Sequence, residues 1–146
     1  MLIDNLNVFS DSQAITATAD STKKVNLNPG KLVGKGEPLL IDVRVTEAFN
    51  NLTSLKVELH QSTTEGGTYA LVPGMSETIL LAGLTKGATF KGIQRLARGA
   101  TGPWYKLVYT VTGTAPTTGK IFSSFVREIP DSYEATQYID KGKTIA

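Results

Sequence analysis

The segment PLLIDVRVTEAF (residues 38–49) alternates apolar and polar side chains with a period of two. One face of the extended chain carries Leu39, Ile41, Val43 and Val45, and the other carries Leu40, Asp42, Arg44 and Thr46. Successive side chains of a strand point to opposite faces of a sheet, so this period predicts a half-buried β-strand. Because no stretch of the chain has a convincing apolar stripe of helical period, the same alternation decides the fold class.

The alternation recurs in two other segments. In TSLKVELHQS (residues 53–62) the apolar face consists of Leu55, Val57 and Leu59. In WYKLVYTV (residues 104–111) it consists of Tyr105, Leu107, Tyr109 and Val111. We expect all these apolar faces to be buried between two sheets. Shorter runs rich in Thr, Val and Ile predict further strands, namely ITATADSTKKVNLN (15–28), SETILLAGL (76–84), ATFKGIQRL (88–96) and GKIFSSFVRE (119–128).

Glycine- and proline-rich turns separate these runs, for example Asn28-Pro29-Gly30 and Pro73-Gly74. About eight short strands at such spacing predict an all-β protein, an antiparallel two-sheet sandwich, with a jelly roll as the leading candidate. Extended N- and C-terminal segments are expected to flank it. We predict one jelly-roll domain over residues 1–128, including an N-terminal arm, and a C-terminal tail over residues 129–146 with no clear period.

Composition narrows the functional classes. The chain has 146 residues, enough for one domain with a core, and a formal net charge of +2. Its lysines are scattered among acidic residues, whereas a duplex-binding protein usually concentrates basic residues on one face. The absence of cysteine excludes disulfides, zinc–thiolate sites and a cysteine nucleophile. The first residues do not resemble a secretory signal, and the apolar runs are too short to span a bilayer.

Catalytic patterns are weak. His60 is the single histidine, and it lies in a predicted strand without a nucleophile elbow near it. The carboxylates are spread along turns and outward strand positions, and the glycine–lysine pairs lack the spacing of a phosphate-binding loop. We therefore expect no catalytic, cofactor-binding or metal-binding residue, and we do not expect an enzyme.

The stretch RLARGATGPWYKLVYTVTG (residues 95–113) combines arginines and aromatics in a way that resembles a site for single-stranded nucleic acid. Strand alternation argues against that interpretation. Trp104 and Tyr105 should point to opposite faces, and Tyr105 and Tyr109 share the face of apolar residues. We expect these tyrosines in the core, with Arg95 and Arg98 before a solvated loop.

Three stretches, in this order, resemble a known family. They are FSDSQAITATADST, GKGEPLLIDVRV and RLARGATGPWYKLVYTVTGTAPTTGKI. The acidic-polar opening, the Gly-Glu-Pro before a strand and the Arg-x-x-Arg-Gly before an aromatic strand are similar to the jelly-roll cement, or decoration, proteins of tailed bacteriophage capsids. The resemblance covers roughly residues 1–128. It does not extend to the tail from Ile129 to Ala146.

This resemblance implies a structural virion protein, made in the host cytoplasm, that binds the outside of a phage capsid. It implies the major capsid protein as partner, with neighbouring capsid subunits bridged and the shell stabilised, and no direct contact with nucleic acid or membrane. We also predict a homo-oligomer, with a dimer favoured over a trimer. The apolar residues proposed for the interface lie near the chain ends: Leu2, Ile3, Phe9, Tyr133, Tyr138 and Ile139.

A second hypothesis remains open at this point. The chain could be a carbohydrate-binding or receptor-binding β-sandwich module of a phage particle. Exposed aromatics such as Trp104, Tyr69 or Tyr133 would then serve as platforms for sugar rings. The sequence does not name the host, the lattice, the copy number or the capsid residues contacted.

Overall fold

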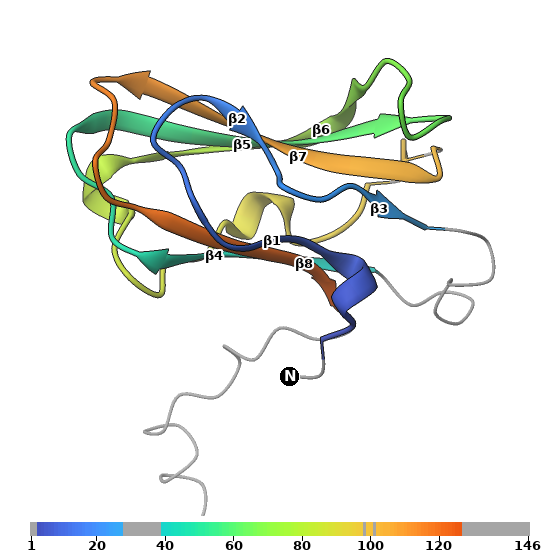
Figure 1. Cartoon of the computed structure of the whole chain (residues 1–146), viewed down its shortest axis with the longest axis horizontal. Coiled ribbons are helices and arrows are strands. Elements are labelled where there is room, and N and C mark those ends of the chain that lie inside the picture. The colour runs from blue at the N-terminus through green and yellow to red at the C-terminus, as the bar shows by residue number, and fades with distance from the viewer. Residues whose placement is uncertain (1–2, 28–38, 98, 101, 127–146) are drawn as a thin grey trace, which may run out of the picture.

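Two antiparallel sheets pack face to face in the computed structural model of the chain (Figure 1), which describes residues 3–27, 39–97, 99–100 and 102–126. The strands are β1 (Val8–Ala14), β2 (Ala19–Asp20), β3 (Val25–Asn26), β4 (Leu40–Glu47), β5 (Leu52–Ser62), β6 (Ala70–Leu80), β7 (Trp104–Gly113) and β8 (Lys120–Val126). The described residues also form the short 3-10 helices η1 (Asn5–Asn7), η3 (Leu81–Gly83) and η4 (Lys91–Ile93). The predicted all-β sandwich is therefore confirmed.

The strands divide into two layers. Sheet A has the order β1-β8-β4, and sheet B has the order β2-β7-β5-β6, with β3 also pairing with β7. The centre of sheet B is the pair β5–β7, whose register runs from Leu52 opposite Gly113 to Ser62 opposite Trp104. These orders are compatible with a jelly roll, but the jelly-roll topology itself stays a prediction.

The alternating residues form the core between the sheets. Leu107 and Tyr109 of β7 are fully buried, as are Leu55, Val57 and Leu59 of β5. On sheet A, Ile41, Val43 and Val45 are at most 1% exposed. Leu39 and Val111 are half-buried and pack against this core. Period-two alternation thus predicted the buried face of the long strands correctly.

Polar and aromatic contacts also join the two sheets. The Tyr109 hydroxyl of β7 lies 2.8 Å from the Ser10 hydroxyl of β1 and 2.8 Å from the Ser123 hydroxyl of β8. Nearby, the ring of Phe125 packs edge-on against Tyr105, with 5.8 Å between ring centroids. Sheet A and sheet B are therefore held in one alignment by directional contacts as well as by apolar burial.

One strand prediction was wrong. The segment at residues 88–96 forms η4 and only two isolated bridges beside β4, Leu40 with Arg95 and Arg44 with Thr89. Its two fully buried apolar residues, Phe90 and Ile93, are three positions apart. A regular strand would point them to opposite faces, whereas a 3-10 turn between them lets both reach the core.

Two other strands differ from the prediction. Residues 8–14, where no strand was predicted, form β1 and pair with β8. β6 begins at Ala70 rather than Ser76, because the expected break at Pro73-Gly74 is an irregularity inside the strand. Gly74 has φ +78°, which a glycine adopts without strain. In the described ranges, no helix has the length and apolar character needed to cross a membrane.

Candidate functional site

One end of the sandwich brings together segments that lie far apart in the sequence. We call it the η1 end. On sheet A it is marked by the register pairs Val8–Ser124 and Leu40–Val126. On sheet B it is marked by Trp104, which lies opposite both Asn26 and Ser62. Helix η1 and the turn after β5 therefore lie at the same end of the molecule.

The sequence Asp4-Asn5-Leu6-Asn7 builds η1 as a short capped turn. The Asp4 carboxylate accepts a hydrogen bond from the Leu6 backbone N–H at 2.9 Å, and the Asn7 N–H donates to the Asp4 carbonyl at 2.9 Å. Aspartate is a favoured cap because its side chain satisfies a free N–H at the first turn. This turn presents the Leu6 side chain to solvent, 67% exposed, beside Ile3, which is 38% exposed.

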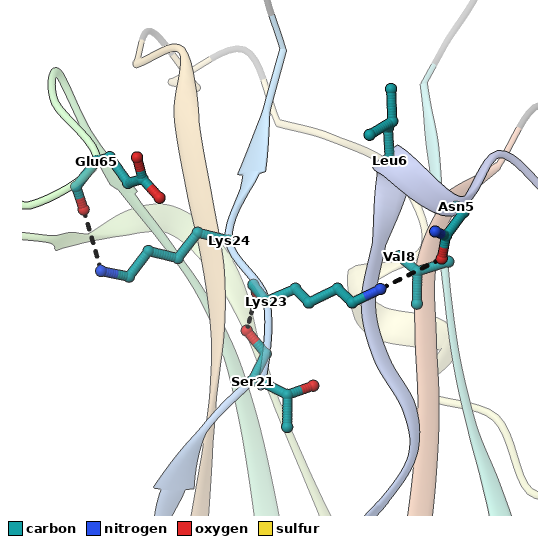
Figure 2. Close-up of a pocket in the computed structure, with 8 residues that line it drawn as sticks. Asn5, Leu6, Val8, Ser21, Lys23, Lys24 and Glu65 are labelled. Carbon is teal, nitrogen blue, oxygen red and sulfur yellow. Dashed lines mark hydrogen bonds between the residues drawn. The ribbon is translucent and has the colours of Figure 1, made fainter.

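A groove of about 560 Å³ lies between η1 and the chain that connects β2 to β3. Its lining residues are Asn5, Leu6, Val8, Ser21, Thr22, Lys23, Lys24 and Glu65. Figure 2 shows Asn5 and Leu6 on one side of it, Lys23 and Ser21 on the chain that crosses it, and Glu65 on the far side. The two sides are tied by backbone bonding, since the Lys23 N–H donates to the Phe9 carbonyl at 2.9 Å. The groove is thus a built feature at the open edge between the two sheets.

The two lysines of the groove have donors to spare. The Lys23 ammonium donates to the Asn5 side-chain oxygen at 3.2 Å, and the Lys24 ammonium donates to the Glu65 carbonyl at 3.0 Å (Figure 2). Neither forms an ion pair with a described residue, whereas Lys106 pairs with Asp20 at 2.7 Å. An ammonium has three N–H donors, so each groove lysine keeps donors for a ligand.

Tyr69, which contacts the groove residues Lys24 and Glu65, is covered on its ring face. The ammonium groups of Lys24 and Lys106 lie 5.2 Å and 4.9 Å from the ring centroid of Tyr69. The Tyr69 hydroxyl donates to the Glu65 carbonyl at 2.9 Å, and burial together with the Glu65 charge raises the pKa of that hydroxyl. Cations within about 6 Å of a ring are attracted to its face, so these lysines compete with any sugar for Tyr69.

The predicted interface residues differ in how exposed they are. Ile3 is exposed at the η1 end, and its role at an interface stays a prediction. Phe9 is fully buried in β1, where its ring centroid lies 4.9 Å from that of Phe125. The proposal that Phe9 offers an apolar group to a partner is therefore wrong, because its side chain belongs to the core. Leu2, Tyr133, Tyr138 and Ile139 lie outside the described residues, as does the tail at 129–146.

The arginine–aromatic stretch does not form a stacking platform. Tyr105 and Tyr109 are buried in the core, as the alternation predicted. Trp104 is half-buried and Arg95 is exposed, and Arg98 lies outside the described residues.

The single histidine lies on the outer face of β5. His60 Nε2 is 3.6 Å from the nearer carboxylate oxygen of Glu58, and Lys56 pairs with the same carboxylate at 3.1 Å. Among the described residues there is no group of three or more His, Asp or Glu side chains arranged to hold a metal ion.

Sequence reasoning missed the groove. Asn5, Leu6, Lys23, Lys24 and Glu65 come from three separate segments, and no period links them. The one available signal was the adjacent pair Lys23-Lys24 just before a strand, which looked like two more scattered lysines.

A family model described as Bbp16 matches residues 9–126. The chain belongs to the Bbp16 family. The matched segment begins one residue into β1 and ends at the last residue of β8, so it coincides with the sandwich and leaves η1 outside. No curated protein matches the chain.

Proposed function

We propose that this member of the Bbp16 family is a structural virion protein that binds the outside of a phage capsid. It bridges neighbouring major capsid subunits and so stabilises the shell. The observation that carries the proposal is the η1 end, where the apolar side chains of Ile3 and Leu6 are exposed. The sequence resemblance to capsid cement proteins supplies the kind of partner.

A rigid block suits this role. The two sheets share one core, and the Tyr109 hydroxyl adds hydrogen bonds from sheet B to both β1 and β8. A bridge between subunits resists outward load only if it does not deform, so its stiffness matters more than any reactive group. Close-packed interiors have low compressibility and transmit strain.

The η1 end supplies the contact chemistry that we assign to the capsid. Exposed leucine and isoleucine side chains gain free energy when an interface removes them from water, at about 25 cal/mol per Å² of apolar area. A specific interface of ordinary size buries about 1,200–2,000 Å² in total. Repetition of this contact over a closed lattice adds avidity, because each further contact is effectively intramolecular.

The structure gives less support to the carbohydrate hypothesis. Tyr69 has two lysine ammoniums over its ring, and Trp104 is half-buried within β7. Tyr133 lies outside the described residues. We therefore keep sugar binding as an outcome that the experiments below would reveal.

A matched pair of leucine substitutions tests the proposed contact. Leu6 is 67% exposed at the η1 end, and Leu80 is 65% exposed at the end of β6 where Ser54 pairs with it, at the opposite end of sheet B. We expect Leu6→Asp to weaken co-sedimentation with intact capsids by about 10-fold or more, because a buried apolar contact of 1.5–3 kcal/mol is replaced by a charge.

The control is Leu80→Asp, which makes the same chemical change on an equally exposed residue. It should leave co-sedimentation unchanged. Equal loss in both variants, or in neither, would remove the η1 end from the capsid contact. Binding of the wild-type chain to a glycan panel without attachment to capsids would move the carbohydrate hypothesis ahead.

A further inference from the structure

We propose that the groove at the η1 end binds the acidic C-terminal segment of the same chain, residues 128–140. The proposal concerns the chain alone and does not depend on capsid binding. It rests on the chemistry of the groove, on the composition of the segment and on the point where the described chain ends.

The groove combines positive charge with apolar surface. Lys23 and Lys24 are exposed, lack ion-pair partners among the described residues and each donate one hydrogen bond to an uncharged oxygen. Leu6 and Val8 line the same groove (Figure 2). Such a surface suits a segment in which carboxylates alternate with apolar side chains.

The sequence EIPDSYEATQYID at residues 128–140 has this composition. Its carboxylates are Glu128, Asp131, Glu134 and Asp140, and it contains no lysine or arginine. Its large apolar and aromatic residues are Ile129, Tyr133, Tyr138 and Ile139. The segment is thus complementary in charge to Lys23 and Lys24, two groove residues that the proposed capsid contact through Ile3 and Leu6 does not require.

The described chain ends close to the groove. Val126 is the last residue of β8, and Ser124 two positions earlier lies opposite Val8, a groove residue. The Ser124 hydroxyl also donates to the Asn7 carbonyl of η1 at 3.2 Å. Residue 128 therefore follows the described chain by only two positions. A short connection gives a tethered segment an effective concentration in the millimolar range, so even weak ion pairs are enough to hold it.

The composition of the chain allows a clean measurement in the full-length protein. Trp104 is the single tryptophan and lies at the η1 end, and the chain has no cysteine. An acceptor fluorophore on Ser132→Cys would report the distance from Trp104 to the segment by energy transfer. We expect efficient transfer at low salt that falls as salt rises, because the lysine–carboxylate pairs are exposed and therefore screened.

Charge reversal identifies the groove. In the labelled chain, Lys23→Glu with Lys24→Glu should lower the docking equilibrium constant about 2- to 30-fold, which is the effect of two surface ion pairs. The salt concentration at which half of the energy transfer is lost, the salt midpoint, should therefore be lower than in the wild-type chain. The control Lys86→Glu with Lys91→Glu makes the same charge change on exposed residues outside the groove, and should leave the midpoint in place. Adding Glu128→Lys and Glu134→Lys to the groove variant should restore the transfer.

Three results would overturn the proposal. The first is transfer in the wild-type chain that is the same at low salt and at high salt. The second is an equal salt midpoint in the groove variant and its control. The third is transfer that rises with protein concentration, since that would place the segment on a neighbouring copy. Loss of capsid attachment alone would leave this proposal standing, so the two proposals fail separately.

Discussion

At the scale of single residues, Tyr109 shows how a polar group can sit inside an apolar core. Its hydroxyl is fully buried but has hydrogen-bond partners on two strands of the opposite sheet, Ser10 and Ser123. Burial raises the pKa of Tyr109 to about 12, and the two serine hydrogen bonds offset only part of that effect. The sequence predicted that Tyr109 faces the core, but no pattern in it identified the serine partners, because they lie on β1 and β8 of the opposite sheet.

The substitution Tyr109→Phe should lower the free energy of unfolding by about 1–3 kcal/mol, since it removes buried hydrogen bonds and leaves the Ser123 hydroxyl without this partner. It should also change the response to alkali. The folded-state pKa of Tyr109 lies above the ordinary value of 10. As pH rises, Tyr109 therefore ionises in the unfolded chain before it ionises in the folded chain. The stability that the neutral, buried hydroxyl contributes is present below pH 10 and is lost as pH rises from 10 to 12.

Urea unfolding at pH 8 and pH 11 measures both effects. The wild-type chain should lose more stability between these two values than the Tyr109→Phe variant does. The control is Tyr69→Phe, whose hydroxyl makes an exposed hydrogen bond, and it should cost less than about 0.5 kcal/mol. An equal pH response in the wild type and the Tyr109→Phe variant would contradict the role given to this hydroxyl.

At the scale of elements, the sequence was informative wherever a strand is long, regular and buried on one face. The β4, β5 and β7 segments were predicted from alternation, and the β8 segment was predicted from its β-branched composition. β1 was missed because its pairing with β8 shifts register twice and Ser12 adopts φ 49°, which breaks the period. The groove could not be predicted at all, because it depends on which separated segments the topology brings to one end.

The turn before β8 provides an element-scale test. Gly119 has φ +132°, and a Cβ there would overlap the ring of Phe49. We expect Gly119→Ala to destabilise the fold by about 1–3 kcal/mol, through strain at this φ and displacement of a buried ring. Thermal or urea unfolding would measure the loss.

The matched control is Gly66→Ala, in the turn after β5. A Cβ at Gly66 would meet nothing within 4 Å, and its φ is not in the left-handed region. This variant should be as stable as the wild type or slightly more stable, because alanine restricts the unfolded chain. Similar losses in both variants would show that the Gly119 turn has no special constraint.

At the scale of the whole molecule, the sandwich has one end that is chemically different from the rest. The chain enters η1 there, leaves β3 there and ends β8 there (Figure 1). Ile3 and Leu6 are exposed at this end, and Leu6 also lines the groove with Lys23 and Lys24. We therefore propose that the capsid contact lies at the η1 end.

Removal of residues 129–146 tests the contribution of the C-terminal segment to assembly. The sandwich core lies within residues 9–126, so the shortened chain should retain its β-sheet circular dichroism. We expect weaker co-sedimentation with capsids, because a segment docked at the η1 end would add Tyr133, Tyr138 and Ile139 to the surface there. Unchanged attachment of the folded, shortened chain would exclude the tail from the capsid contact.

The most direct test of the proposed function is DNA release from heated, genome-filled particles with and without this protein. A protein that binds only the assembled shell stabilises it by about 2.7 kcal/mol per site at a hundredfold excess over the dissociation constant. Summed over many sites, this should raise the temperature of DNA release, and adding the purified protein back to stripped particles should restore it. Identical release curves at confirmed full occupancy would contradict the claim that the protein stabilises the capsid.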